Sequence, residues 1–165
     1  MKKIAYCLLS LVMVLAITAC SSSEPKVEIT AESAVTSLQE KISTIVKTVV
    51  YDEETDPNEN LGRPGQYIGK ADFFDNRMEF EDENAGTIEF FSSKSDCNDR
   101  YDYLCNLSDP ELGAFGVNEY IYKYDLAIFR VSFDLAPSEA EEYKKAMDEI
   151  MNETSEQYKG AENNE

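Results

Sequence analysis

A short turn rich in glycine and proline holds side chains suited to binding. The run from Gly62 to Tyr67 reads GRPGQY. The planar, permanently charged guanidinium of Arg63 can hold a carboxylate or phosphate with paired hydrogen bonds, and the Tyr67 ring offers a flat contact surface. We therefore predict that this turn and the loop before it contact a partner or ligand. The candidate contact residues are Arg63, Gln66, Tyr67, Asp56 and Asn58. In the alternative interpretation, the glycines and proline only set the turn, and Arg63 pairs with a local acid such as Asp56.

The acidic loop before the turn suggests a calcium site as a second possibility. Side chains with oxygen atoms alternate along it, at Asp52, Glu54, Asp56, Asn58 and Asn60. An EF-hand loop starting at Asp52 needs Gly at its sixth position and Glu at its twelfth. Pro57 and Arg63 occupy those positions, which excludes an EF-hand. A looser calcium site stays open, and a solvated acidic loop is the default interpretation.

The composition argues against several classes of function. The absence of His excludes Ser-His-Asp and Cys-His catalysis and His zinc sites. With 33 acidic residues, no pair of carboxylates stands out as catalytic. No Gly-rich phosphate loop or nucleophile motif is present. The 33 acidic against 15 basic residues also disfavour nucleic acid, which is bound mainly through Lys and Arg. We predict no enzyme, no catalytic residues, no assigned metal ligands and no cofactor.

The N-terminus has the pattern of an export signal. Two lysines follow Met1, and an apolar stretch from Ile4 to Ile17 is broken only by Ser10. Small residues then precede Cys20. A charged start, an apolar stretch and a small-residue cleavage site are typical of a secretory signal peptide. The stretch is shorter than the ~20 apolar residues of a membrane-spanning helix.

The end of this segment resembles the lipobox of bacterial lipoproteins. The run from Ile17 to Cys20 reads ITAC. The resemblance implies cleavage before Cys20, lipid attachment to its sulfur, and anchoring at the extracytoplasmic face of the cell membrane. Two acyl chains would hold the protein far more stably than one. The membrane is thus a predicted partner, through the lipid on Cys20. An ordinary signal peptide with a chance cysteine is the alternative.

Two cysteines, Cys97 and Cys105, fall in the expected exported domain. They share helical spacing with Tyr101 and Leu104. Eight residues along a helix span about 12 Å, beyond the ~7 Å limit between the Cα atoms of a disulfide. We predict a helix in which both cysteines are buried as small apolar side chains, with a disulfide between them as the alternative.

Three segments have apolar residues at helical spacing. The expected helices are 31–49, 96–107, and one that starts at Pro137 and carries apolar residues as far as Met151. Thr30 is the expected N-cap of the first. Ser93 or Ser95 is expected to start the second. Ser138 and Glu141 have the spacing of a capping box in the third.

Four segments have the composition of strands. They are 66–74, 87–92, 120–124 and 126–133. The last two form an expected hairpin near Asp125. Tyr120, Tyr122 and Tyr124 share one face of this hairpin, and we favour packing against the last helix over an exposed aromatic strip.

The order of these elements predicts an α+β fold: an antiparallel sheet of about four to five strands covered by about three helices. The expected organisation is a signal peptide over 1–19, a lipidated cysteine and polar tether over 20–29, one domain over 30–158, and a polar tail over 159–165.

Several segments are similar to a group of small lipoproteins of low-GC Gram-positive bacteria. They are 56–58, 61–67, Lys70, 86–91, 99–104, 118–120 and 136–143. The resemblance implies location and fold, and it carries no catalytic residues. Our leading hypothesis is a lipid-anchored, non-enzymatic binding or accessory module whose candidate partner is another extracytoplasmic protein. The alternative is a small-ligand or calcium-binding lipoprotein.

Overall fold

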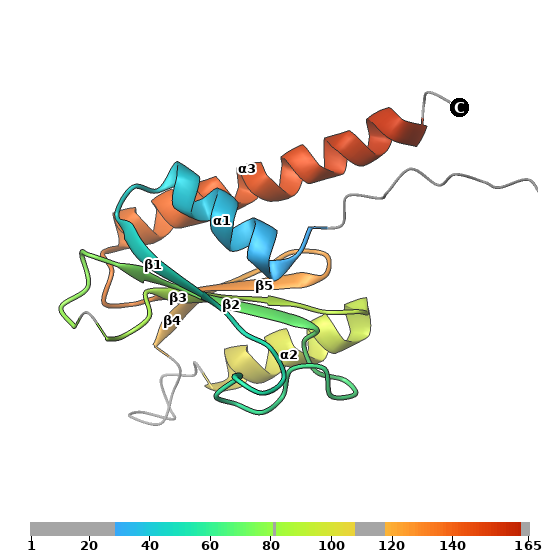
Figure 1. Ribbon diagram of the computed structural model, residues 1–165, viewed down its shortest axis with the longest axis horizontal. Helices are drawn as coiled ribbons and strands as arrows, with labels where there is room; N and C mark the ends of the chain where they lie inside the picture. Colours follow the sequence, from blue (N-terminus) through green and yellow to red (C-terminus); the bar gives the residue numbers. More distant parts are fainter. Residues whose placement is uncertain (1–28, 81, 108–117, 163–165) are drawn as a thin grey trace, which may run out of the picture.

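A five-stranded antiparallel sheet forms the middle layer of the part of the chain that the structure describes (Figure 1). The structure is a computed structural model that describes residues 29–80, 82–107 and 118–162, with side chains as far as Glu153. The elements are α1 (Ala31–Lys41), β1 (Ile45–Val50), β2 (Gly69–Asp75), β3 (Gly86–Phe90), α2 (Lys94–Leu107), β4 (Glu119–Lys123), β5 (Ala127–Ser132) and α3 (Pro137–Glu162). The strand order is β1-β2-β3-β5-β4. The predicted α+β fold is confirmed.

The helices lie on both faces of the sheet. α1 and α3 cover one face and contact each other, and α2 covers part of the other face (Figure 1). The expected signal peptide, Cys20 and most of the expected tether precede residue 29 and therefore lie outside the described residues. The predictions for those segments stay predictions.

The first helix is shorter than its apolar spacing predicts. Its N-cap is Thr30, as predicted, and the Thr30 and Ser33 side chains each accept a hydrogen bond from the other residue's backbone. The helix ends at Lys41, however, and Ile42 is extended. The predicted helix over 31–49 is therefore wrong beyond Lys41. The segment that follows is rich in β-branched residues, which favour strands, and it pairs with β2 as strand β1.

Each of the other two helices starts beside a side chain that accepts a hydrogen bond from a backbone N–H group. The Ser93 hydroxyl accepts from the Asp96 N–H at 3.1 Å, so Ser93, one of the two predicted residues, caps α2. At the start of α3, the Glu139 carboxylate accepts from the Ala136 N–H at 2.8 Å. The predicted capping pair of Ser138 and Glu141 is wrong, because the helix already starts at Pro137.

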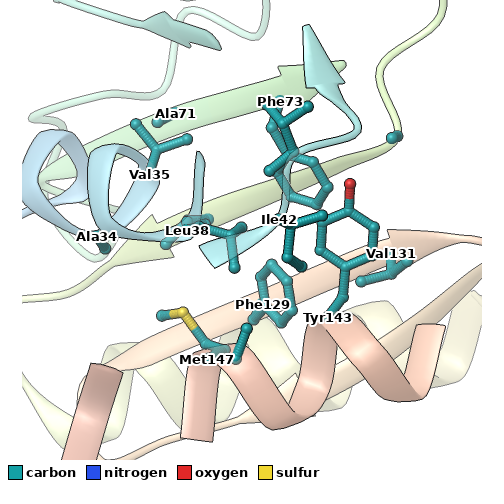
Figure 2. Close-up of a cluster of buried hydrophobic side chains, with 14 of the residues drawn as sticks. Ala34, Val35, Leu38, Ile42, Ala71, Phe73, Phe129, Val131, Tyr143 and Met147 are labelled. Atoms are coloured by element: carbon teal, nitrogen blue, oxygen red, sulfur yellow. The ribbon is translucent and has the colours of Figure 1, made fainter. Parts of the chain in front are cut away.

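The main core lies between the sheet and the pair α1 and α3. Figure 2 shows Phe73 of β2 and Phe129 of β5 meeting Tyr143 and Met147 of α3, with Leu38 of α1 beside them. The Phe73 ring stacks on Tyr143 at 4.8 Å and on Phe129 at 5.7 Å between centroids. All five side chains are fully buried. These residues fix the two helices to the central strands.

The hairpin of β4 and β5 forms one end of the sheet, with β4 as the edge strand. Residues 119–123 pair antiparallel with residues 128–132. Tyr120, Tyr122 and Tyr124 are partly buried against the main core. Packing on the core, the favoured prediction for this tyrosine row, is confirmed.

The second face of the sheet is also covered, by α2 and by the loop between β1 and β2. A smaller apolar cluster lies there, formed by Tyr67, Phe91, Cys97, Leu104 and Ile128. Charged and polar side chains of the central strands share this face. Lys70, Asp72, Thr87 and Glu89 are all buried. β2 and β3 are thus buried on both sides, which is unusual for strands that carry charged residues.

The two cysteines of α2 differ in environment. Both are free thiols, and they lie in one helix as predicted. Cys97 is fully buried, and burial raises the pKa of its thiol to about 11. Cys105 is exposed. Burial of both cysteines was expected, and for Cys105 that prediction is wrong.

Candidate functional site

The loop between β1 and β2 contains all five predicted contact residues. Its first half is folded by Asp52, whose carboxylate accepts hydrogen bonds from the Glu54 N–H at 3.0 Å and from the Thr55 N–H and hydroxyl at 2.8 and 2.7 Å. An acidic side chain that accepts from backbone groups two and three residues ahead is a local turn device. Asp52 therefore shapes the loop.

Two glycines shape the second half of the loop. Gly62 and Gly65 have φ of 76° and 75°, in the left-handed region that favours glycine. A Cβ at Gly62 would lie 2.6 Å from the Glu53 carboxylate. The Gly62 N–H also donates to the Tyr67 carbonyl at 2.9 Å. The predicted turn is confirmed, and its glycines are needed by the backbone.

Asp56 is the centre of the loop. Its carboxylate is buried, although the loop runs over the surface. One oxygen, Oδ2, accepts from the Tyr67 hydroxyl at 2.6 Å and from the N–H groups of Asn60 and Leu61 at 2.9 and 3.1 Å. The other oxygen, Oδ1, accepts from Lys70 Nζ at 3.0 Å. A single side chain thus connects the loop backbone to a core tyrosine and to strand β2.

Lys70 completes this buried pair from the sheet. The exposed fraction is 4% for the Lys70 side chain and 0% for that of Asp56. The Lys70 ammonium lies 4.7 Å from the centroid of the Tyr51 ring and 5.8 Å from that of Tyr67. Aromatic faces attract a cation, the more so away from water. We refer to Asp56, Lys70, Tyr67 and Tyr51 as the loop hub.

The contacts within the loop hub lower the pKa of Asp56 and raise the pKa of its two tyrosines. Burial by itself raises the pKa of Asp56, but the hydrogen bonds from Tyr67, the Asn60 N–H and Lys70 outweigh it and hold that pKa well below its usual range. Burial, together with the hydrogen bond to the Asp56 carboxylate, raises the pKa of Tyr67. Over the physiological pH range Asp56 is therefore a carboxylate and Tyr67 is a neutral phenol.

The hub also connects to a second buried carboxylate. The Tyr51 hydroxyl donates to Asp72 Oδ2 at 2.8 Å, and the Thr87 hydroxyl donates to Asp72 Oδ1 at 2.7 Å. Burial, followed by the hydrogen bond to Asp72, raises the pKa of Tyr51. Polar contacts therefore run from the loop through β2 to β3.

The structure separates the five predicted contact residues into two groups. Tyr67 and Asp56 lie inside the domain and offer a partner no exposed surface. Arg63 and Asn58 are exposed, and Gln66 is half-buried. The Asn58 amide donates to the Tyr67 hydroxyl at 3.4 Å. Contact through Arg63, Gln66 and Asn58 stays a prediction.

The alternative interpretation pairs Arg63 with a local acid such as Asp56; Arg63 does contact a local acid, but that acid is Glu59 and not Asp56. The Arg63 guanidinium lies 3.6 Å from the Glu59 carboxylate, and 60% of its side chain is exposed. Lys70 occupies the place that was expected for Arg63, because β2 brings it beneath the loop. Arg63 therefore remains at the surface, where its hydrogen-bond donors face solvent.

A further charged cluster lies on the same face of the sheet, beneath α2. The Glu89 carboxylate is fully buried and accepts from Arg100 Nε and Nη2 at 3.0 and 2.8 Å. Arg130 Nη2 lies 3.3 Å from Glu89 Oε1, and Arg130 Nη1 donates to Glu119 at 2.9 Å. The sequence analysis missed this cluster. Glu89 alternates with the apolar residues Ile88 and Phe90. In a strand with one buried side, this pattern places the charged residue in solvent, so the sequence did not indicate that Glu89 is buried.

The carboxylate oxygens of Asp52 and Asp56, which the calcium interpretation needs as ligands, already accept hydrogen bonds within the protein. Asp52 accepts from the loop backbone, and Asp56 accepts from Lys70, from Tyr67 and from three backbone N–H groups of the loop. Within the described ranges, no group of three or more Asp, Glu or Cys side chains is placed to hold a metal ion. The Asp52 and Asp56 carboxylates therefore stabilise the fold of the loop in this structure.

None of the helices in the described part of the chain is long and apolar enough to cross a bilayer. In comparisons with known proteins, no family model, no curated protein and no solved structure matches the chain. The proposals below therefore depend on the residues and geometry of this chain.

Proposed function

We propose that the protein is a lipid-anchored extracytoplasmic module that binds another extracytoplasmic protein and performs no catalysis. The observation that carries the binding role is the construction of the loop between β1 and β2. Asp56 holds it from inside, through Lys70 and Tyr67, while Arg63 stays exposed. A loop that is already ordered loses less conformational entropy when it binds.

The charges at the loop surface favour a partner with basic groups. Glu53, Glu54 and Glu59 are exposed, as is Asp52, and Arg63 lies among them. The whole chain has a formal net charge of −18. Complementary potentials speed up encounter and fix orientation more than they add affinity. Arg63 would then give the contact its register by pairing with one acidic group of an otherwise basic partner.

The buried acids support a binding role over a catalytic one. Asp56 and Glu89 are each paired with a cation at 3.0 and 2.8 Å, respectively. Asp75 is likewise buried and paired with Arg77 at 2.6 Å. Removing Asp56 or Glu89 would leave Lys70 or Arg100 without its acidic partner inside the protein, whereas Arg77 would keep Glu142 at 2.8 Å. These acids are therefore accounted for by the fold.

The lipid anchor is supported by the lipobox-like run from Ile17 to Cys20 and by the distance to the domain. Only residues 21–28 separate Cys20 from Ile29, the first described residue. Fully extended, the nine Cα–Cα steps from Cys20 to Ile29 reach at most about 32 Å. The domain would then stay close to the membrane surface, which restricts its partners to membrane proteins and to molecules near the membrane.

The anchor is tested with two cysteine variants in cells fed a labelled fatty acid. Cys20→Ala is expected to lose the label and to leave the membrane fraction. Cys105→Ala, the matched control at an exposed cysteine, is expected to keep both. Label that persists in Cys20→Ala would refute the anchor.

The binding role is tested by crosslinking intact cells and identifying the co-purified proteins. Arg63→Ala is expected to lose the partner. Lys145→Ala, the matched control, removes an exposed cation from α3, on the opposite face of the sheet, and is expected to keep it. A partner retained by both variants would exclude the loop as the contact, and the absence of any enriched protein would contradict the binding role itself.

A further inference from the structure

Strand β4 is an open edge of the sheet and has a self-complementary sequence. In the described residues it pairs only with β5. Its five residues, Glu119 to Lys123, read EYIYK. When this sequence runs antiparallel to a copy of itself about its central Ile121, each Glu faces a Lys, each Tyr faces a Tyr, and Ile121 faces itself.

The backbone of β4 has the phase that such a pairing needs. The Tyr124 N–H donates to the Ala127 carbonyl at 2.8 Å, and the Phe133 N–H donates to the Asn118 carbonyl at 3.0 Å. Because hydrogen-bonded and non-bonded pairs alternate in an antiparallel ladder, even-numbered residues of β4 bond to β5. Glu119, Ile121 and Lys123 therefore direct their N–H and C=O groups toward the open edge. These are the residues that face one another in the symmetric register.

We infer that β4 pairs with β4 of a second copy of this chain, about a two-fold axis at Ile121, so that the two sheets become one continuous sheet. A two-fold interface uses the same patch on both subunits, which a self-complementary strand provides. Each bonded pair exchanges two N–H···O bonds.

The side chains at this edge are arranged for the same register. Glu119 and Lys123 lie on the face of the sheet that carries α2, with Glu119 held by Arg130 at 2.9 Å and Lys123 held by Asn98 at 2.8 Å. Both are therefore oriented before a partner arrives. Opposite charges that face each other across strands stabilise the pairing, whereas like charges destabilise it. The symmetric register gives two such opposite pairs and no like pair.

The aromatic residues of β4 extend the argument to the other face. Tyr120 and Tyr122 are partly buried, and they contact Phe133 and Phe129 at 4.5 and 6.1 Å between ring centroids. In the symmetric register Tyr120 faces Tyr122 of the second copy in a non-bonded pair, where side chains approach most closely. The tyrosine row would then continue across the two copies.

The opposite edge of the sheet lacks these properties. Strand β1 has an irregular register between Ile45 and Lys47, and a bulge with a lysine is a common protection of an edge strand. Its one charged residue, Lys47, would face an uncharged residue in a self-pairing centred on Thr48. Charge complementarity therefore selects β4.

The register is tested by placing one cysteine in β4 of the purified full chain, in mild detergent and in a background in which Cys7, Cys20 and Cys105 are each replaced by Ser, so that buried Cys97 is the remaining native thiol. A short bifunctional thiol reagent then joins cysteines on neighbouring strands. Ile121 would lie about 5.5 Å from its copy between Cα atoms. Lys123, two residues from the axis, would lie about 14 Å from its copy. We expect Ile121→Cys to give a dimer, and Lys123→Cys, which is more exposed, to give none above background.

The outcomes of this experiment are distinct. Equal crosslinking of the two variants would show random collision and would overturn the proposal, as would no crosslinking of Ile121→Cys. A product of any mass other than twice that of the chain would indicate a different occupant of the edge and would also overturn it.

A second measurement avoids any substitution of Ile121, which contacts the apolar cluster beneath α2. Sedimentation of the unsubstituted chain is expected to show a dimer. Lys123→Glu opposes two pairs of carboxylates and is expected to weaken the dimer about tenfold, whereas Lys123→Arg preserves it. A monomeric unsubstituted chain, or a Lys123→Glu variant that associates as strongly as Lys123→Arg, would overturn the assignment.

Discussion

Removing Lys70 should rescue a chain that has lost Asp56. The two side chains form a buried pair with 3.0 Å between Nζ and Oδ1. We consider three variants of the full chain: Lys70→Met, Asp56→Ala and the double variant. Methionine has about the length of the lysine stem without the charge, so it tests the pair with little change in packing.

The magnitudes follow from what each variant leaves behind. In Lys70→Met, Asp56 keeps the Tyr67 hydroxyl and the N–H groups of Asn60 and Leu61. The loss is one hydrogen bond to a charged group, about 1.5–3 kcal/mol of unfolding free energy. In Asp56→Ala, the ammonium is left buried without its carboxylate, which costs about 3–5 kcal/mol, and the loop N–H groups lose their acceptor. We therefore expect Asp56→Ala to be the more destabilising.

The double variant gives the decisive sign. It removes the unpaired ammonium that Asp56→Ala creates, so it should be more stable than Asp56→Ala alone by about 1–3 kcal/mol, although it carries one more substitution. The assay is urea unfolding. The chain has no Trp and ten Tyr, so far-ultraviolet circular dichroism and tyrosine fluorescence are the two probes, and their transitions should coincide.

Two results would refute this reasoning. A double variant that is no more stable than Asp56→Ala would mean that a buried Lys70 ammonium without the Asp56 carboxylate does not lower the free energy of unfolding. Equal effects of the two single variants would mean that the N–H groups and the hydroxyl on Asp56 contribute nothing beyond the ion pair. If Asp56→Ala does not fold, Asp56→Asn replaces it with the same expected order.

Three further predictions follow from the same structure. The pKa of Asp56 in the folded protein lies below its unfolded value of about 3.9. The stability that Asp56 contributes is therefore present above about pH 3.9 and is lost as the pH falls toward the folded pKa. Asp56→Asn should reduce the loss of urea stability over that pH range. In the native protein a thiol reagent should modify exposed Cys105 and spare buried Cys97 until the chain unfolds. Mass spectrometry of the peptides measures both modifications, and modification of Cys97 before Cys105 would contradict the placement of α2. Arg63→Ala should change the unfolding free energy by less than about 0.5 kcal/mol, because its contact with Glu59 is exposed, and a larger loss would give Arg63 a structural role.

The sequence predicts the elements whose local signals agree with their packing. The hairpin of β4 and β5 combines alternating apolar residues with a tight connection, and it forms as predicted. The Thr30 cap and the helix around Cys97 are also confirmed. In each case the residues that define the element lie close together in the chain. Local physics is then sufficient.

The first helix shows where local spacing misleads. Apolar residues continue at helical intervals past Lys41, but they are mostly Ile and Val. β1 can form only when β2 is present to pair with it. Spacing within one segment contains no information about that partner, so the tertiary pairing overrides the apparent helix.

The site was located in part. The sequence indicates the turn and its glycines, and the structure confirms them. It does not indicate that Asp56 is buried, because that depends on Lys70, fourteen residues ahead, and on Tyr67. The burial of Glu89 depends in the same way on Arg100 of α2 and Arg130 of β5. In single-sequence reasoning, charged residues are assigned to solvent, and only a sheet covered on both faces reverses that assignment.

The placement of α1 and α3 on one face of the sheet has a consequence for how two copies would sit at a membrane. A two-fold axis that joins antiparallel neighbours in one sheet stands perpendicular to that sheet, so both copies present the same face to the same side. Each α1 begins beside Ile29, where the chain enters the domain. Both entry points would therefore lie on one side of the joined sheet. Two lipid anchors could then insert into a single bilayer, and four acyl chains, instead of two, would hold the pair.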